Sequence, residues 1–288
     1  MRRRALTRLR QAGTPPTALA SSACDTSRID NRPGCGGAVG VGAAANERPD
    51  GYTFLMSTAG PLVLLPSMMA NLPYNPARSF TYVAPMGGAP IVCAVKGDGP
   101  IASLSDYAAA ARRAPEAVSF GSSGIGSMGH LTGVLFGAEA GAQMLHAPFR
   151  GAPEAQTAVL SGTTTSLWDT ASANVQAIRA GTMRGLCVSS AQRASILPDV
   201  PTAREAGFTN VVSINWFMMC GPAGLPDSIT ERLGSAIRGI LAEPAIRARF
   251  DAVAFVAGED TPQPGLAAWV AAEQARWAPI VRTSGASM

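Results

Sequence analysis

Charged residues, histidines and long apolar runs are all scarce in this 288-residue sequence. Lys, Arg, Asp and Glu make up 15% of it and hydrophobic residues 47%, which excludes a disordered chain and is typical of a globular one. No apolar run reaches the length of about eighteen residues that a membrane-spanning helix needs. The two histidines and five cysteines stand singly, so we expect neither a metal site nor a bound cofactor.

Positive charge is concentrated at the N-terminal end. Residues 1–32 hold seven Arg and two Asp, a net charge of +5, whereas the whole chain carries +4. The remaining 256 residues, 33–288, are therefore close to neutral at −1 and carry no basic stripe. We accordingly expect no nucleic-acid partner.

The first thirty residues are atypical. Arg2, Arg3 and Arg4 resemble the start of an export signal, but residues 7–17 are polar where an apolar stretch should follow. We expect residues 1–30 to be a disordered N-terminal segment without a working signal peptide.

Short β-type runs alternate with helical patterns from residue 50 onward. Strands are expected at 52–57, 91–96, 117–121, 144–148, 164–168, 185–189 and 213–220. Helices are expected at 103–114, 129–140, 153–160, 171–180, 227–242, 244–253 and 264–284. This alternation predicts an α/β fold with parallel sheets covered by helices, and the helical tail after 226 should pack back across an earlier lobe.

One stretch, residues 117–135, points to chemistry. A strand runs into a Gly- and Ser-rich turn, and a helix then begins. Glycines let backbone N–H groups approach a ligand, and a helix start offers unpaired N–H donors and partial positive charge. The turn is therefore a candidate anion site for a carboxylate or a phosphate, with the candidate residues Ser122, Ser123, Gly124, Gly126 and Ser127.

Two other interpretations of this turn stay open. Residues 124–129 match G-x-G-x-x-G and could serve a nucleotide-dependent oxidoreductase, although no acidic residue follows at the distance a dinucleotide site needs. The turn could also cap its helix and bind nothing. A Ser–His nucleophile would use His130, but no acid partner is indicated, so we expect no enzyme.

Two further strand ends carry candidate residues. Ser57, Thr58 and Ala59 close one strand, where hydroxyl groups could donate to a ligand at the sheet edge. Asp169 closes another, where it could cap the next helix or contact a polar group of the ligand.

Several short motifs, weak singly, occur in an order and spacing that resemble the Bug family of substrate-binding proteins of tripartite tricarboxylate transporters. They are Asn31–Gly34 with Gly36-Gly37, Pro49–Thr53, Leu72–Tyr74, Gly121–His130, His146–Gly151, Leu197–Thr202, Glu205–Gly207, Trp216-Phe217, Pro222–Gly224 and Trp277 through Ala286. Together they extend over residues 30–288.

The resemblance implies a two-lobed type II periplasmic binding-protein (Venus flytrap) fold, with lobe 1 at 31–97 plus 222–288 and lobe 2 at 98–221. It implies a periplasmic, monomeric receptor that captures a small carboxylate for the integral-membrane subunits of its transporter. The ligand contacts implied are Ser57, Thr58, Ala59, Ser122, Ser123, Gly124, Gly126, Ser127, His130 and Asp169.

The chain departs from the family at its start. The family opens with a strand and a Pro/Gly-rich loop that forms half of the carboxylate grip, and residues 1–30 match neither. The first strand and loop of lobe 1 are thus expected to be missing or replaced, which would impair binding or leave a remnant that binds nothing.

Overall fold

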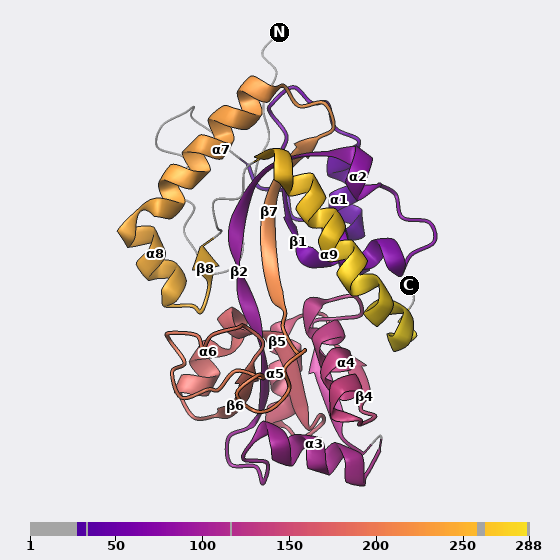
Figure 1. Ribbon diagram of the computed structural model, residues 1–288, viewed down its shortest axis with the longest axis vertical. Coiled ribbons are helices and arrows are strands. Elements are labelled where there is room, and N and C mark those ends of the chain that lie inside the picture. Colours follow the sequence, from indigo (N-terminus) through magenta and orange to yellow (C-terminus); the bar gives the residue numbers. More distant parts are fainter. Residues whose placement is uncertain (1–27, 33, 116, 258–262, 287–288) are drawn as a thin grey trace.

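The computed structural model describes residues 28–32, 34–115, 117–257 and 263–286. Its helices and strands form two lobes, one above the other in Figure 1. The first lobe surrounds a sheet of β1, β7, β8 and the first part of β2, and the second surrounds a sheet of β3, β4, β5, β6 and the last part of β2. The two-lobed α/β fold is confirmed, whereas the residue boundaries given above for the lobes remain a prediction.

A single long strand, β2 (Phe80–Lys96), belongs to both sheets. Its residues 80–90 pair with β7 (Ile214–Pro222), and its residues 91–96 pair with β5 and β6 (Figure 1). The sequence predicted only 91–96, because Pro85, Gly87 and Pro90 disfavour a strand. Register shifts within 82–87 accommodate these residues as β-bulges.

The second sheet is mixed. Its strands are β3 (Ser119–Ser122), β4 (Leu145–Pro148), β5 (Ser166–Thr170) and β6 (Met183–Val188). β3 runs parallel to β4 and β5, as the alternating pattern predicted. The expectation of parallel sheets was wrong for the first sheet, where the pairs among β1, β2, β7 and β8 are antiparallel. It was also wrong for β2 in the second sheet, where this strand enters from the other lobe and pairs antiparallel with β5 and β6.

Four helices cover the second sheet, and each begins and ends within one residue of its expected bounds. They are α3 (Leu104–Arg113), α4 (Met128–Ala140), α5 (Ala152–Leu160) and α6 (Ala171–Arg179). Ser103 caps α3 and Ser127 caps α4, each accepting a backbone N–H three residues later. Both caps fix where the following helix begins.

The first lobe contains short elements that the sequence did not predict. These are the 3₁₀-helix η1 (Cys35–Gly37), α1 (Ala38–Ala45), the π-helix η2 (Gly60–Leu64), the 3₁₀-helix η3 (Leu65–Ser67), α2 (Pro76–Ser79) and the two-residue strand β8 (Val256–Ala257). β1 (Leu55–Thr58) pairs with β7, and the described residues before it hold no strand. The expectation for residues 1–30 falls almost wholly outside the described residues, which include only the last three of them.

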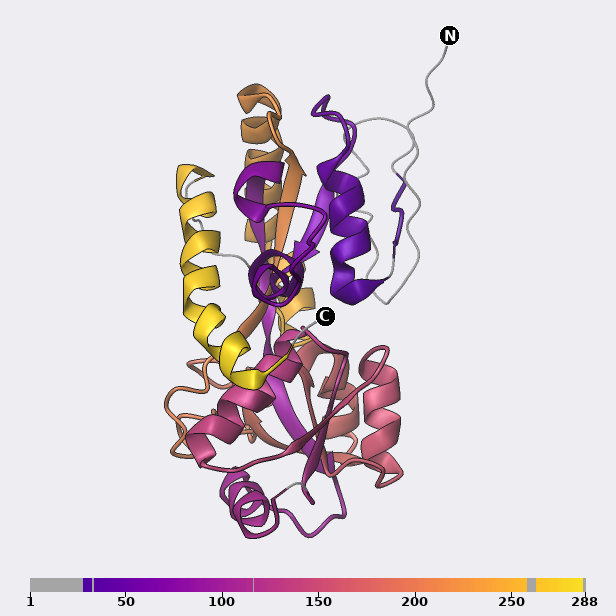
Figure 2. The same ribbon diagram turned by 90° about the vertical axis from the view of Figure 1, so that its right-hand side faces the viewer.

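The C-terminal helices pack back onto the earlier part of the chain, as expected. They are α7 (Asp227–Ala242), α8 (Pro244–Asp251) and α9 (Gln263–Ser284). α9 runs along the first lobe toward the second (Figure 2). Gln274 donates to the Leu62 carbonyl at 2.6 Å, Arg276 donates to the Val212 carbonyl, and Trp277 is fully buried. This helix therefore ties segments distant in sequence together.

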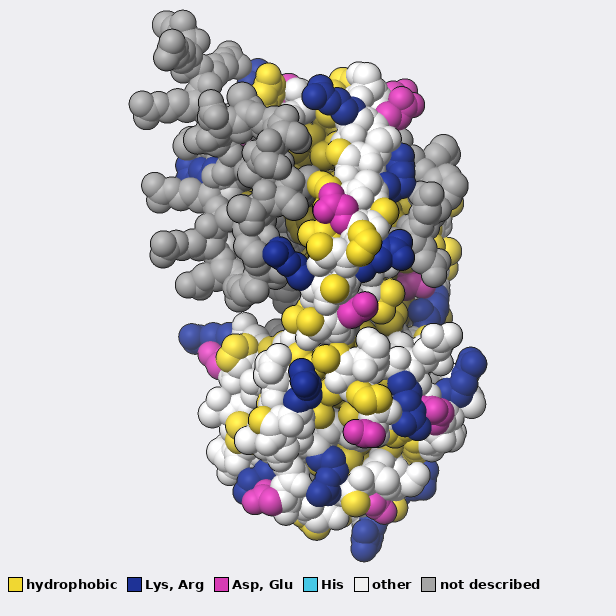
Figure 3. All heavy atoms as spheres, turned by 90° about the vertical axis from the view of Figure 1, so that its left-hand side faces the viewer, with side chains coloured by type: hydrophobic (Ala, Val, Ile, Leu, Met, Phe, Trp, Pro, Cys, Tyr) yellow, Lys and Arg dark blue, Asp and Glu magenta, His cyan; other side chains and the backbone are white. Residues whose placement is uncertain are grey.

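The described surface carries charges of both signs. On the face in Figure 3, Lys and Arg side chains alternate with Asp and Glu over the second lobe. Among the described residues, no helix combines the length and apolar character that crossing a membrane requires.

Candidate ligand-binding site

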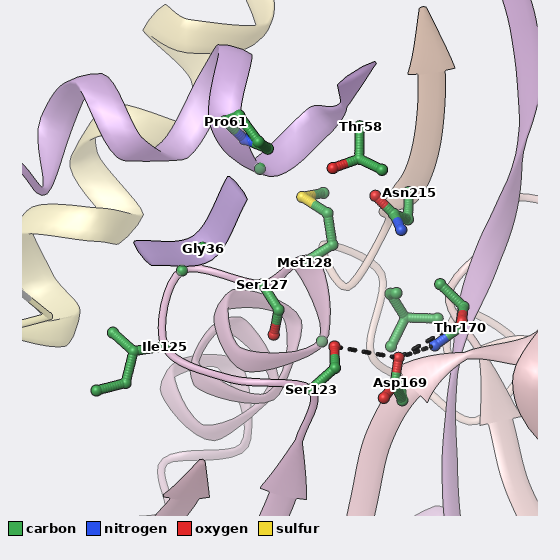
Figure 4. Close-up of a pocket in the computed structure, with 14 residues that line it drawn as sticks. Gly36, Thr58, Pro61, Ser123, Ile125, Ser127, Met128, Asp169, Thr170 and Asn215 are labelled. Atoms are coloured by element: carbon green, nitrogen blue, oxygen red, sulfur yellow. Dashed lines mark hydrogen bonds between the residues drawn. The ribbon is translucent and has the colours of Figure 1, made fainter. Parts of the chain in front are cut away.

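A cavity of about 250 Å³ lies where the two lobes meet (Figure 4). The first lobe contributes Gly36, Thr58, Gly60 and Pro61 to its lining, and β2 and β7 contribute Ile91 and Asn215. The second lobe contributes Ser123, Ile125, Gly126, Ser127, Met128, Gly129, Asp169 and Thr170. The turn at 123–127 therefore faces a space between the two lobes.

The turn between β3 and α4 depends on two glycines. Gly124 has φ +127° and Gly126 has φ +77°, conformations that residues with a Cβ rarely adopt. Ser127 then starts α4 by accepting the His130 N–H at 3.2 Å. Met128 and Gly129 occupy the first two helical positions, whose N–H groups have no partner within an α-helix, and both residues line the cavity. The positive end of α4 thus faces the cavity.

The first lobe packs closely against this turn. A Cβ added at Gly60 would lie 3.1 Å from the Gly126 carbonyl oxygen, and one at Gly126 would lie 3.1 Å from a methyl of Leu65. A Cβ added at Gly36 would lie 3.6 Å from the Ile125 carbonyl oxygen. Small residues on both sides therefore let the two lobes approach each other beside the cavity.

Three of the predicted contacts, Ser122, Gly124 and His130, are not among the lining residues. Ser122 is fully buried, and its hydroxyl bonds His146 Nε2 at 2.8 Å. The Gly124 N–H donates to the same hydroxyl, and His130 Nδ1 accepts the Gly126 N–H at 3.4 Å. The polar atoms of these residues are thus used in hydrogen bonds within the protein, and they support the turn from the side away from the cavity.

Burial keeps both histidines neutral. It lowers the pKa of His130 to about 4, and burial together with the neighbouring His130 ring lowers the pKa of His146 well below its usual value. Because His130 Nδ1 accepts a hydrogen bond, its proton resides on Nε2. The pair therefore adds no positive charge behind the turn at neutral pH.

Asp169 is the one ionisable residue among those that line the cavity. It stands near the end of β5, is 3% exposed, and accepts the Thr170 N–H at 2.7 Å and the Ser123 hydroxyl at 3.5 Å through Oδ1. Its Oδ2 is buried with no partner among the described residues. Burial raises the pKa of this carboxyl to about 6, against the smaller lowering effect of its hydrogen bonds.

Of the three predicted ligand contacts at the end of β1, only one faces the cavity. Thr58 lines the cavity, and in Figure 4 it lies across from Met128. Ser57 is buried and bonds the Thr58 carbonyl, and Ala59 is fully buried at the start of η2. The alternation of side chains along a strand allows one of two neighbours to face the cavity while the other faces the core.

Sequence reasoning missed several lining residues. Gly36 belongs to a Gly-rich motif on which the family resemblance rested, and this motif could have identified it as a lining residue. Ile91 and Asn215 stand on β2 and β7, and neither has a local pattern that marks it. They reach the cavity because these strands connect the lobes beside it.

The lining suits an anion held by neutral donors. Hydroxyl groups, one amide and the start of α4 surround the space, and none of the fourteen lining residues is Lys, Arg or His. Within the described part of the chain, no three His, Cys, Asp or Glu side chains gather closely enough to hold a metal ion. The hydroxyl groups and the start of α4 can together hold a small acid.

Known proteins with similar sequences belong to one family of transporter receptors. The sequence profile of the tripartite tricarboxylate transporter family receptor matches residues 16–286. Protein BugT of Bordetella pertussis is 31% identical over 90% of this chain and 80% of its own length. A Pseudomonas sp. protein of the UPF0065 group is 33% identical over 76% of the chain, which spans 65% of that relative.

Two solved structures with bound acids share the fold. Rpa4515 of R. palustris with adipate is 27% identical, with a TM-score of 0.88 over 94% of this chain and 90% of its own. MatC of Rhodopseudomonas palustris with bound malate is 26% identical, with a TM-score of 0.80 over 88% of this chain and 87% of its own.

Proposed function

Because the chain belongs to the tripartite tricarboxylate transporter receptor family, we propose that it is an extracytoplasmic solute-binding protein that captures a small carboxylate. It delivers this acid to the integral-membrane subunits of a transporter of the same class. The observation that carries the proposal is the cavity at the start of α4, which is lined from both lobes by neutral hydrogen-bond donors.

The ligand carboxylate binds at the start of α4. The amides of Met128 and Gly129 and the hydroxyl of Ser127 are the donors available there, and a helix N-terminus favours negative charge. Thr58 and Asn215 contact the ligand from the opposite side. An acid that touches both sides stabilises the closed arrangement of the lobes, because it binds that arrangement better than an open one.

The other predicted contacts position these groups. Ser122, Gly124 and His130 hold the turn from behind, and Ser57 and Ala59 set the path of the chain around Thr58. Asp169, which accepts a hydrogen bond from Ser123 of the turn, contacts a polar group of the ligand.

The size of the cavity favours a small acid over a dinucleotide. Pockets for drug-sized molecules span about 300–1,000 Å³, and this cavity has about 250 Å³. The turn at 124–129 also packs against Gly36 and Leu65, which leaves little room for a pyrophosphate. The adipate and malate held by the two relatives support an organic acid as the ligand class.

A thermal-shift panel tests the proposal. We expect small carboxylic acids to raise the melting temperature in proportion to the logarithm of ligand concentration, and NAD and single-stranded DNA to leave it unchanged. Size-exclusion chromatography should give a monomer with and without the acid. If NAD alone raises the melting temperature, the hypothesis of a nucleotide-dependent oxidoreductase replaces that of a carboxylate receptor. If no compound raises it, the chain is a remnant that binds nothing.

A further inference from the structure

Three buried hydroxyl groups link the strands that connect the lobes to the start of α4. They belong to Thr132, Ser189 and Ser213, whose exposed fractions are at most 1% and which do not line the cavity. Buried polar groups are retained in a fold where their hydrogen bonds are satisfied. The partners of these three hydroxyls show which parts of the molecule they join.

Ser189 lies where the two connecting strands meet the second lobe. β2 and β7 run side by side between the lobes (Figure 1), and their pairing ends at Pro90 and Ile214. One residue further, the Ser189 Oγ accepts the Ile91 N–H at 2.8 Å and donates to the Ser213 carbonyl at 2.6 Å. The Ser189 backbone also donates to the Ile91 carbonyl and accepts the Ser213 N–H. Ser189 therefore holds the ends of both connecting strands together.

Ser213 connects these strand ends to α4. Its hydroxyl lies 2.8 Å from the Thr132 hydroxyl, which lies 2.6 Å from the Met128 carbonyl oxygen. A carbonyl oxygen can only accept, so Thr132 donates its single proton to Met128, and the Ser213 hydroxyl donates to Thr132. The two hydroxyl bonds thus run in one direction, from the connecting strands into the first turn of α4.

This chain of hydrogen bonds ends on a peptide group that faces the cavity. The Met128 carbonyl and the Gly129 N–H belong to one planar unit, so a bond that fixes the carbonyl also fixes the direction of the N–H. Met128 and Gly129 line the cavity, and so does Ile91 at the other end of the chain. The Gly129 N–H is one of the two backbone donors assigned above to the ligand carboxylate. Hydroxyls outside the cavity therefore orient a donor inside it.

We propose that Thr132, Ser189 and Ser213 are positioning residues for ligand capture. They orient the Met128–Gly129 peptide toward the acid, and they make the start of α4 move together with the ends of the connecting strands when the lobes close. This inference rests on the proposed function and adds to it three residues that do not touch the ligand.

Two replacements of Thr132 separate positioning from stability. Thr132→Val keeps the shape of the side chain and removes the hydroxyl, whereas Thr132→Ser keeps the hydroxyl and removes a methyl group. Both should lower the free energy of unfolding in urea, because Thr132 is fully buried. Only Thr132→Val should weaken binding, by about three- to tenfold, and Thr132→Ser should bind like wild type. Calorimetric titration measures the affinity with whichever of succinate, malate, citrate and adipate raises the melting temperature of wild type most.

Ser213→Ala tests the same hydrogen bond from its other side. This variant loses the hydroxyl but keeps the Ser213 carbonyl, so the bond from Ser189 remains. It should weaken binding as much as Thr132→Val does. The double variant should bind no more weakly than either single variant, because all three lack the same hydrogen bond.

The matched control is Ser166→Ala. The Ser166 hydroxyl is also fully buried in the second lobe, where it bonds the Tyr107 hydroxyl at 2.7 Å, and Ser166 does not line the cavity. Its loss should lower the free energy of unfolding and leave the affinity for the acid unchanged.

The outcomes separate the two levels of inference. If Thr132→Val and Ser213→Ala bind the acid as tightly as wild type, or if Thr132→Ser and Ser166→Ala lose as much affinity as they do, the positioning role is wrong and carboxylate capture stands. If one of the two hydroxyl-free variants does not fold, the other decides; if neither folds, the hydroxyls serve stability and the positioning role is wrong. If wild type binds none of the four acids, both proposals fail.

Discussion

The imidazole rings of His130 and His146 stack face to face, with centroids 3.8 Å apart and planes inclined by 17°. His130 comes from the first turn of α4 and His146 from β4, so the pair joins the helix whose start lines the cavity to the edge of the second sheet. Their hydrogen bonds reach Gly126 and Ser122 in the binding turn. The stack therefore supports the turn from the side away from the ligand.

Acid should weaken the fold through this pair. Both histidines have a folded-state pKa below the ordinary value of about 6.5, which is about 4 for His130. As pH falls below 6.5, the unfolded chain therefore binds protons that the folded chain does not, and the free energy of unfolding falls. Each unit by which the folded-state pKa lies below the unfolded-state pKa contributes about 1.4 kcal/mol to this loss of stability.

Urea unfolding at pH 7 and pH 5 measures this effect. The parent for the comparison is Asp169→Asn, because ionisation of Asp169 changes stability in the opposite direction over the same range. His146→Gln in that parent should lose less stability between the two pH values, since one titrating ring is gone while an amide remains for Ser122. An unchanged loss would contradict the role assigned to the stack.

Asp169 should destabilise the empty protein at alkaline pH. Its folded-state pKa, about 6, lies above the ordinary value of 3.8, so the folded chain keeps a proton that the unfolded chain releases between these values. The free energy of unfolding therefore falls as pH rises from 4 to 6. Asp169→Asn should raise it at pH 8 by up to about 3 kcal/mol and have little effect at pH 4.

Urea midpoints of ligand-free protein at the two pH values check this prediction, with Asp251→Asn as the control. An Asn variant that is equally destabilised at pH 8 and pH 4 would mean that hydrogen-bond geometry, not charge, dominates at this position. The comparison needs no ligand, so it is independent of the binding proposals.

Ser127 should matter for both stability and binding, and Ser103 for stability alone. Each caps a helix, with N–H to Oγ distances of 3.2 Å for Ser127 and 3.1 Å for Ser103. Replacement of either by Ala should lower the free energy of unfolding by about 1 kcal/mol. Only Ser127 lines the cavity, so only Ser127→Ala should also weaken binding of the acid. Equal affinities for the two variants would remove Ser127 from the site.

Gly60 should control how closely the lobes approach. An added Cβ would lie 3.1 Å from the Gly126 carbonyl oxygen, so Gly60→Ala must push the turn back by a few tenths of an ångström. We expect weaker binding of the acid with little change in stability. Calorimetry and urea unfolding together distinguish these effects.

The matched control is Gly239→Ala. Gly239 is exposed on α7, and an added Cβ meets nothing within 4 Å. Alanine there should raise the free energy of unfolding by about 0.8–1.0 kcal/mol through helix propensity and leave affinity unchanged. Normal affinity in Gly60→Ala would contradict close approach of the lobes at this point.

Local patterns in the sequence were sufficient for much of this protein. The helices of the second lobe and the C-terminal helices follow from apolar spacing within each segment, helped by serine caps on α3 and α4. The Gly- and Ser-rich turn before α4 was recognisable because left-handed glycines and a serine cap are properties of neighbouring residues. Five of the ten predicted contacts line the cavity: Thr58, Ser123, Gly126, Ser127 and Asp169.

Only the tertiary structure decided which of those groups remain available to a ligand. Ser122 and His130 looked equivalent to their neighbours in sequence. In the fold, His146 of β4 bonds the Ser122 hydroxyl and stacks on the His130 ring, whose Nδ1 accepts the Gly126 N–H. The first part of β2 was hidden by Pro and Gly because its pairing with β7 comes from a segment more than a hundred residues away. Side-chain hydrogen bonding and strand pairing depend on residues far apart in sequence, and they determine which polar groups remain free to bind a ligand.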